Sequence, residues 1–299
     1  MHGGADARTA PLKERTPAPP EDLGEQVRRA LAEDVGSGDL TAALVPAAAS
    51  AVGQVVTRES ALLCGQAWFD EVFRQLDSSI SVEWSLPEGA SVNAGDLLCR
   101  VCGPARGILT GERTALNFLQ TLSGTATAAR AFVDAVAGTG CRILDTRKTL
   151  PGLRTAQKYA VACAGATNHR KGLYDAILIK ENHIIAAGSI TAAVDAAHRS
   201  SPGVKVEVEV ESLAELEEAL AARADMVLLD EFTTVDLVKA VEINRAHGHP
   251  LLLEASGGIA LENVRDIGLT GVDFISIGGI TKHLKAIDLS MRFALLPKQ

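Results

Sequence analysis

Long apolar segments are absent from this sequence of 299 residues. No run of about 18 residues is both apolar and uncharged, and the N-terminal stretch lacks the apolar core of a signal peptide. We therefore expect no membrane-spanning helix and no secretion. The excess of Asp and Glu gives a net charge of −8, which argues against nucleic acids or anionic membranes as partners.

Cysteine is too scarce and too scattered for a disulfide framework. The five cysteines are odd in number and lie in apolar stretches, which is typical of a reduced, cytoplasmic chain. Cys99 and Cys102 form a CxxC pair, but no second pair and no nearby histidines complete a zinc site. We therefore expect buried or idle thiols and a cytoplasmic location.

Lysine is missing between Lys13 and Lys148. The segment PEGASVNAGD resembles the turn of biotinyl and lipoyl carriers, which present a lysine at the tip of a hairpin. Because this part of the chain has no lysine, a carrier module is excluded.

Positive charge is concentrated in one part of the chain. Residues 142–180 carry eight Lys or Arg against two Asp, a net charge of +6, so the remainder carries −14. A local cationic field within an anionic protein indicates a pocket for a small anion.

The sequence pattern changes near Gly140, which predicts two folded domains. We expect a disordered tail over 1–22, where prolines are frequent and large apolar side chains are rare. The mixed pattern of 23–136 predicts an N-terminal α/β domain. Over 137–280, short apolar strands alternate with helical patterns, which indicates βα units and a parallel sheet.

Six strands are expected in the second domain, at 142–144, 176–179, 204–210, 226–229, 251–255 and 274–277. Right-handed crossovers would curl such units into a barrel or part of one. Because a complete barrel has eight units, we expect an open α/β barrel.

Polar residues or glycines follow each expected strand. The groups are Asp145-Thr146-Arg147-Lys148, Lys180-Glu181-Asn182-His183, the glutamates at 207, 209 and 211, Asp230-Glu231, Ser256-Gly257-Gly258 and Gly278-Gly279. Since active sites of α/β barrels lie at the C-terminal ends of the strands, all six groups are expected at one mouth.

The residue types in these groups suit an anionic ligand. Carboxylates or phosphates are bound by cations such as Arg147, Lys148, Arg170 and Lys180. His169 lies in a largely polar segment and is expected to be functional rather than a core histidine. The histidines at 2, 198, 247 and 249 look like tail or surface residues.

Two carboxylates and two glycine pairs complete the pattern. Glu209 and Asp230 lie on neighbouring strands and suit ribose hydroxyls or Mg²⁺. Glu207 shares a strand face with Glu209, so alternation leaves open which one points into the mouth, and we expect the other to be solvated. The glycine pairs in ASGGI and SIGGI allow backbone N–H groups to approach a phosphate. The pattern predicts a ligand that combines a sugar phosphate with a metal-bound diphosphate.

Several motifs resemble the quinolinate phosphoribosyltransferase family, namely DTRKTLPGLR, NHRKGLYDAILIKENHI, VEVEV, LLDEF, LEASGGI and VDFISIGGITK. The likeness extends from about Glu33 to Leu289. It implies transfer of a phosphoribosyl group from 5-phosphoribosyl-1-pyrophosphate to quinolinate with Mg²⁺ as cofactor. The products would be nicotinate mononucleotide, pyrophosphate and CO₂, on the route to NAD.

The resemblance also implies an architecture. An open α/β barrel is joined to the N-terminal α/β domain, which a C-terminal helix within 281–299 completes. The protein would form a homodimer or a higher assembly, in which Arg113 reaches the site of the partner subunit.

The resemblance assigns a role to each site residue. The two quinolinate carboxylates would be held by Arg147, His169, Arg170 and Lys180. The catalytic residues would be Lys148, between substrate and donor, and Glu209 and Asp230, around the ribose and Mg²⁺. The phosphate would be bound by Ser256, Gly257, Gly258, Gly278 and Gly279. Glu231 departs from the asparagine that is usual in the family and adds negative charge near the metal.

Other functions are compatible with parts of this pattern. A related phosphoribosyltransferase that acts on nicotinate, or a molybdenum-transport-associated homologue, would share the fold. A lyase could form a Schiff base on Lys180, although the carboxylates and glycine pairs would then be unexplained. A non-catalytic anion sensor is a third class, which only turnover distinguishes.

Overall fold

The computed structural model describes residues 16–297, which divide into two compact units. The sheet unit comprises 131–148 and 166–279, and the N-terminal unit comprises the remaining described residues, 16–130, 149–165 and 280–297. Most of the tail expected at 1–22 lies outside the described residues.

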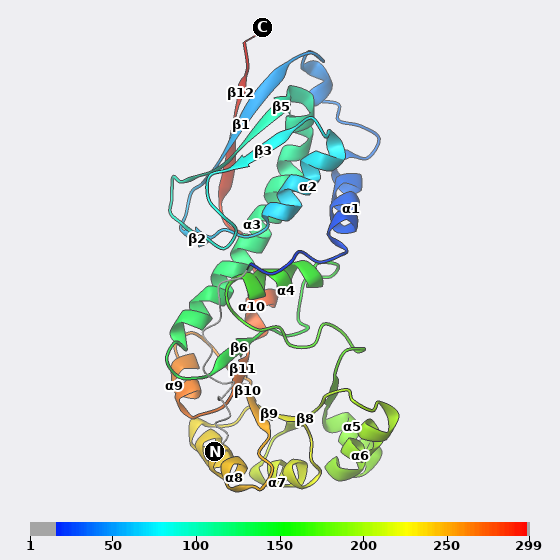
Figure 1. Ribbon diagram of the computed structural model, residues 1–299, viewed down its shortest axis with the longest axis vertical. Helices are drawn as coiled ribbons and strands as arrows, with labels where there is room; N and C mark the ends of the chain where they lie inside the picture. The colour runs from blue at the N-terminus through cyan, green and yellow to red at the C-terminus, as the bar shows by residue number, and fades with distance from the viewer. Residues whose placement is uncertain (1–15, 298–299) are drawn as a thin grey trace, which may run out of the picture. The chain divides into compact units, whose positions relative to one another are not determined.

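A six-stranded parallel sheet forms the centre of the sheet unit (Figure 1). Its strands are β6 (Arg142–Leu144), β7 (Ile177–Ile179), β8 (Val206–Val210), β9 (Met226–Asp230), β10 (Leu252–Ser256) and β11 (Phe274–Ser276). They are ordered β6-β11-β10-β9-β8-β7, and every neighbouring pair is parallel. Because β6 and β7 are at opposite ends of this order, the strands form an open sheet, as the alternating pattern predicts.

Helices alternate with these strands along the chain, and all of them except α5 bury apolar side chains. They are α5 (Glu181–Ala187), α6 (Ile190–Ser200), α7 (Leu213–Ala221), α8 (Thr234–Ala246) and α9 (Val264–Leu269). Three of them begin at a hydroxyl cap, because Ser189, Ser212 and Thr233 each accept a hydrogen bond from a backbone N–H of the first turn. Along α7, Leu216, Ala219 and Leu220 are buried, as the helical spacing requires.

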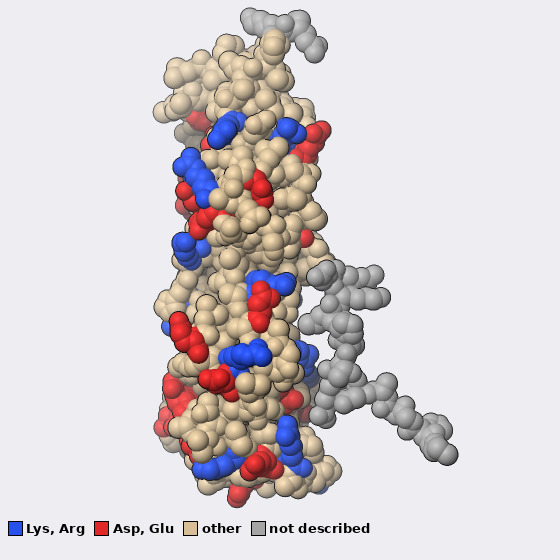
Figure 2. All heavy atoms as spheres, turned by 90° about the vertical axis from the view of Figure 1, so that its left-hand side faces the viewer, with Lys and Arg blue, Asp and Glu red and all other residues tan. Residues whose placement is uncertain are grey.

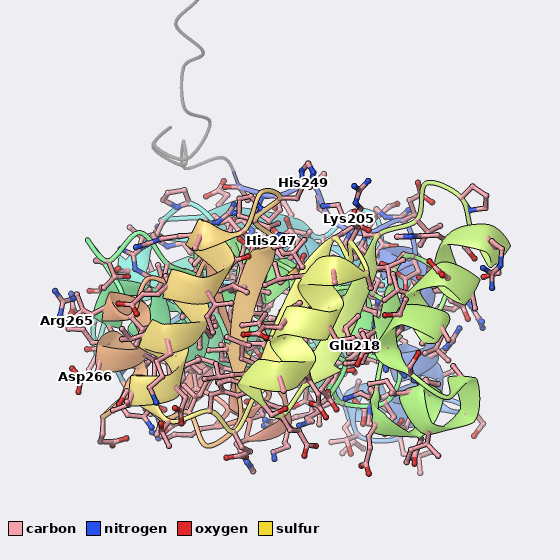
Figure 3. The ribbon with its side chains drawn as sticks, turned by 90° about the horizontal axis from the view of Figure 1, so that it is seen from below. Lys205, Glu218, His247, His249, Arg265 and Asp266 are labelled. Atoms are coloured by element: carbon pink, nitrogen blue, oxygen red, sulfur yellow. The ribbon has the colours of Figure 1, made fainter. Side chains whose placement is uncertain are left out.

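The outer surface of the sheet unit carries ordinary polar contacts (Figure 3). Nη1 of Arg265 donates to the backbone oxygens of Ala135 (3.0 Å) and Ala137 (3.1 Å), at the C-terminal end of the helix whose last residue is Ala135. His247 and His249 follow α8, and His249 is exposed, as expected of a surface histidine. On the face that Figure 2 shows, cationic and anionic side chains are interspersed rather than gathered by sign.

The N-terminal unit is built on a four-stranded antiparallel sheet. Its strands, in spatial order, are β12 (Leu289–Leu295), β1 (Ser50–Thr57), β5 (Leu97–Pro104) and β3 (Ser81–Trp84), and a smaller pair is formed by β2 (Ala61–Leu62) and β4 (Ser91–Val92). The helices are α1 (Leu23–Val35), the 3₁₀ helix η1 (Ala42–Leu44), α2 (Gln66–Leu76), α3 (Ala105–Ala135), α4 (Arg154–Cys163) and α10 (Gly279–Lys282). Its core contains Trp68, Phe69 and Phe73 of α2.

The prediction of a C-terminal helix within 281–299 is wrong, because this segment contains the strand β12. It pairs antiparallel with β1, from Ala51 opposite Leu295 to Thr57 opposite Leu289. Large apolar residues recur at every second position, with Met291 and Phe293 between the two leucines, and this is the period of a strand rather than a helix. The chain therefore completes the N-terminal unit by adding an edge strand to its sheet.

No helix among residues 16–297 is long and apolar enough to cross a membrane. All five cysteines are free thiols, in agreement with the absence of a disulfide framework. Cys99 is buried and Cys102 is partly exposed, although both lie on β5. They are an odd number of positions apart, so they face opposite sides of the strand.

Candidate active site

A cavity of about 240 Å³ in the sheet unit gathers residues from several of the groups that the sequence places at the strand ends. It is lined by Thr146, Arg147, Lys148, His169, Arg170, Leu178, Lys180, Glu209, Leu228, Asp230, Glu254, Ser256 and Ser276. The parallel order of the strands explains this assembly, since their carboxyl ends meet at one edge of the sheet.

Arg147 and Lys148 enter the cavity from the end of β6. The hydroxyl of Thr146 accepts a hydrogen bond from the backbone N–H of Lys148 at 3.1 Å. A Cβ atom at Gly278 would lie only 2.8 Å from Cδ of Lys148. Gly278 therefore leaves space for the Lys148 side chain, which is a role in addition to the predicted contact with phosphate.

Asp145 holds the loop that carries His169 and Arg170. It is fully buried at the end of β6, where Oδ1 accepts from the backbone N–H of His169 (2.8 Å) and Oδ2 from Nδ2 of Asn168 (2.7 Å). The sequence marks Asp145 as a strand-end residue but assigns it no role. Its position shows that the aspartate fixes the loop rather than facing a ligand.

Two guanidinium groups lie close together in the cavity. Burial lowers the pKa of Arg170, and the positive charge of Arg147 lowers it further, against the opposing effects of Glu207 and Asp175. Adjacent guanidinium groups destabilise one another unless an anion neutralises both. The arrangement therefore favours a ligand with more than one negative charge.

His169 is held between a backbone donor and two buried carboxyl groups. The N–H of Arg170 donates to Nδ1 at 2.7 Å, so the ring proton lies on Nε2. Nε2 is 2.8 Å from Oε2 of Glu207 and 3.4 Å from Oε2 of Glu254. Burial lowers the pKa of His169, but the hydrogen bonds and charges of the two glutamates raise it to about 10. Protonation of Nδ1 would require the hydrogen bond from the backbone N–H of Arg170 to break.

Glu207 and Glu254 are the structural support of this histidine. They lie on β8 and β10 and are 5% and 0% exposed. Burial raises the pKa of Glu207; Glu254 raises it further and His169 lowers it. The expectation that Glu207 or Glu209 is merely solvated is wrong, since Glu207 is buried against His169 whereas Glu209 lines the cavity. Glu254 was missed by the sequence reasoning, although a single glutamate within the apolar run LLLEA is unusual.

A second pair of carboxylates lies beside the lysines. Nζ of Lys180 forms an ion pair with Oε2 of Glu209. Burial raises the pKa of Asp230, Glu209 and Glu231 raise it further, and Lys180 and Lys148 lower it. Glu209 and Asp230 offer carboxylate oxygens whose negative charges repel one another. A hard divalent cation prefers such oxygen ligands and would relieve the repulsion.

The glycine pairs follow the strands whose serines line the cavity. Gly257 and Gly258 have φ of +91° and +56°, which are left-handed conformations that favour glycine. Glu231 is also left-handed, with φ of +56°, and its backbone N–H donates to the oxygen of Ser256 at 3.0 Å. A Cβ atom at Gly257 would lie 2.6 Å from Cδ of Glu231. The side chain of Glu231 thus lies against the predicted phosphate-binding turn.

Gly279 begins α10 directly after Gly278. Neither residue is among those that line the cavity, nor are Gly257 and Gly258. Arg113 is not among them either, and it belongs to α3 of the N-terminal unit.

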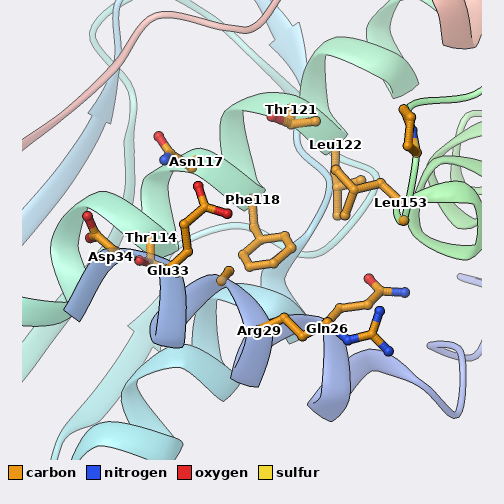
Figure 4. A pocket seen from close by; sticks show the side chains of 13 residues that line it. Gln26, Arg29, Glu33, Asp34, Thr114, Asn117, Phe118, Thr121, Leu122 and Leu153 are labelled. Atoms are coloured by element: carbon orange, nitrogen blue, oxygen red, sulfur yellow. Dashed lines mark hydrogen bonds between the residues drawn. The ribbon is translucent and has the colours of Figure 1, made fainter. Parts of the chain in front are cut away.

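A second cavity, of about 390 Å³, lies within the N-terminal unit (Figure 4). It is bordered by Arg29, Glu33 and Asp34 of α1 and by Thr114 and its neighbours on α3. The hydroxyl of Thr114 donates to Oδ2 of Asp34 at 3.3 Å, and this hydrogen bond joins α1 to α3. Thr114 directly follows Arg113 in the sequence.

Comparison with known proteins identifies the family. The model of the quinolinate phosphoribosyl transferase N-terminal domain matches residues 39–123, and the model of the C-terminal domain matches residues 125–292. Together they cover most of the chain, including every strand of the parallel sheet.

Individual relatives agree with this match. A nicotinate-nucleotide pyrophosphorylase (carboxylating) from Mycobacterium leprae is 41% identical over 274 residues, 89% of this chain and 95% of the relative. The human protein of the same name is 39% identical over 277 residues, 92% of each chain. A solved structure of nicotinate-nucleotide pyrophosphorylase from Francisella tularensis is 46% identical, with a TM-score of 0.89 over 93% of this chain and 98% of that chain. The chain therefore belongs to the quinolinate phosphoribosyl transferase family, as its motifs indicate.

Proposed function

We propose that this chain transfers the phosphoribosyl group of 5-phosphoribosyl-1-pyrophosphate to quinolinate, with release of pyrophosphate and CO₂, in the biosynthesis of NAD. The relatives named nicotinate-nucleotide pyrophosphorylase (carboxylating) support this reaction. The observation that carries it is a single cavity that combines the guanidinium pair of Arg147 and Arg170 with the carboxylates of Glu209 and Asp230. Such a cavity suits a dianionic acceptor and a donor that carries ribose and diphosphate.

The guanidinium pair would bind the two carboxylates of quinolinate, with Lys180 nearby. Each guanidinium group can donate two parallel hydrogen bonds to one carboxylate, which fixes the plane of the ring. His169 would hold this arrangement because Glu207 and Glu254 anchor its Nε2.

Catalysis would depend on position and charge. A bond forms between the ring nitrogen of quinolinate and the anomeric carbon, while the bond from that carbon to pyrophosphate breaks. Loss of CO₂ leaves an electron pair on the ring carbon beside the now cationic nitrogen, and this carbon then takes a proton. Lys148 would lie between acceptor and donor and stabilise the departing negative charge.

Glu209 and Asp230 would hold Mg²⁺ and the ribose hydroxyls. These two carboxylates are half-buried on neighbouring strands, and burial and then the charge of Glu209 raise the pKa of Asp230, so the ligand set fits this cation. When bound, Mg²⁺ supplies positive charge that neutralises the pyrophosphate. The glycine turns at 257–258 and 278–279, with Ser256, would contact phosphate through backbone N–H groups.

We also propose a homodimer or a higher assembly, in which Arg113 of one subunit reaches the site of the other. The family resemblance of the segment GERTALNF supports this arrangement. We propose a cytoplasmic location as well, which the free thiols support.

Turnover with two acceptors tests the function. The protein is incubated with 5-phosphoribosyl-1-pyrophosphate and Mg²⁺, and quinolinate and nicotinate are offered in separate reactions. We expect CO₂ and nicotinate mononucleotide from quinolinate alone. Product from nicotinate alone would instead indicate a related phosphoribosyltransferase and contradict the role of the guanidinium pair.

A further inference from the structure

Four side chains with metal-binding or acidic groups meet within the N-terminal unit, and none of them takes part in the proposed reaction. Cys64 precedes α2, Glu88 precedes β4, and Tyr159 and Cys163 lie on α4. The two sulfur atoms and a carboxylate oxygen of Glu88 all lie within 4.8 Å of one another. Three segments that are distant in the sequence thus bring two thiols and a carboxylate together.

Glu88 is held in a fixed orientation. Its Oε1 accepts hydrogen bonds from the backbone N–H of Gly65 (2.8 Å) and from the hydroxyl of Tyr159 (2.9 Å), and Oε2 accepts from the N–H of Gln66 (3.1 Å). A carboxylate offers about four acceptor positions, so these three hydrogen bonds leave capacity for a further ligand. Neighbours that orient a ligating group in this way typically strengthen a metal site.

The two thiols differ in exposure. Cys64 is fully buried. Cys163 is partly exposed. A divalent cation would bind both sulfur atoms as thiolates, because it displaces the thiol protons and neutralises the charges that then arise.

We propose that Cys64, Cys163 and Glu88 form a binding site for a thiophilic divalent cation, with Zn²⁺ as the reference ion. Two sulfur ligands and one carboxylate oxygen are among the ligands that Zn²⁺ prefers, and three protein ligands leave a fourth position for water. The ligand set differs from the all-oxygen set of Glu209 and Asp230, so hard cations such as Mg²⁺ do not compete for it.

The site has a structural consequence. It joins the segment before α2 to the C-terminal end of α4, so the cation binds the folded N-terminal unit and stabilises it. Because its ligands lie outside the cavity of the sheet unit, the site is independent of the proposed transferase reaction.

Titration with Co²⁺ tests the proposal on the full-length protein, kept reduced with a phosphine. Thiolate ligands give Co²⁺ an intense charge-transfer absorption that oxygen ligands do not give, so binding at Glu209 and Asp230 is distinguished. We expect this band to saturate at one ion per chain and Zn²⁺ to displace the Co²⁺.

Variants locate the ligands. Cys64→Ala and Cys163→Ser each remove one of the two thiolates and are expected to lower the band to about half or less, whereas Cys102→Ser, which removes a thiol elsewhere in the unit, leaves it unchanged. Tyr159→Phe removes the hydrogen bond that orients Glu88 and is expected to weaken Co²⁺ binding on the order of tenfold.

Two results would overturn the site. One is a folded, reduced wild-type protein that shows no thiolate band at saturating Co²⁺. The other is a band of full intensity in Cys163→Ser. This variant changes a partly exposed residue and leaves the buried Cys64 intact, so it is expected to fold. Because the first result needs no variant, the proposal stays testable even if Cys64→Ala does not fold.

Discussion

Nε2 of His169 lies 2.8 Å from Oε2 of Glu207, and this contact links the loop that carries Arg170 to the interior of the sheet. The pKa of His169 is raised from 6.5 to about 10, so its protonation stabilises the folded protein. This contribution is complete below about pH 6.5 and is lost as the pH rises toward about 10. Stability is therefore expected to decline over that interval.

Glu207→Gln tests this linkage. The substitution removes the charge that raises the pKa of His169, so we expect a flatter decline of the free energy of unfolding between about pH 6.5 and pH 10. Denaturant unfolding at a series of pH values measures the slope. Glu217→Gln, on the exposed face of α7, is the matched control and should retain the wild-type slope. A wild-type slope in Glu207→Gln as well would contradict the assignment.

Gly278→Ala should impair catalysis without unfolding the protein. The added Cβ would lie 2.8 Å from Cδ of Lys148, and a flexible lysine side chain moves aside more easily than backbone. Displacement of a catalytic group by about 1 Å can lower the rate on the order of 100-fold. We expect a fall in kcat of that order with little change in thermal stability. Gly248→Ala, where nothing lies within 4 Å of the new Cβ, should behave as wild type.

Glu231→Asn should improve both stability and donor binding. Asparagine tolerates the left-handed conformation of this residue, so we expect a gain of about 1 kcal/mol in the free energy of unfolding. Loss of the carboxylate beside Gly257 should also lower the KM for 5-phosphoribosyl-1-pyrophosphate. Arg223→Asn relieves the same strain at φ of +60° but changes no site charge. If both variants lowered the KM equally, the charge of Glu231 would not be the cause.

Local patterns predict the parallel sheet well. Each expected strand overlaps the observed one, because a short apolar run between helical patterns is typical of strands that are buried on both faces. The alternation of apolar residues in β12 is present in the sequence and has the period of a strand, whereas the family resemblance implies a helix there.

Contacts between distant segments are what the sequence could not reveal. The strand ends predict that Lys180 and Glu209 lie at one mouth, but the support of His169 by both Glu207 and Glu254 depends on the spatial order of β8, β9 and β10. The packing of Gly278 against Lys148 likewise becomes visible only when β11 lies beside β6.

The preference for a dianion over a monoanion is the most direct test of the site. Calorimetry gives the dissociation constants of quinolinate and nicotinate for the wild type, for Arg147→Ala and for the control Arg199→Ala, which changes an exposed arginine of α6. Loss of one member of a charged hydrogen-bonded pair typically lowers affinity by about 2 kcal/mol or more. We expect the wild type and Arg199→Ala to bind quinolinate at least about 10-fold more tightly than nicotinate, and folded Arg147→Ala to lose this preference. Equal affinities in the wild type, or an unchanged preference in Arg147→Ala, would contradict the account.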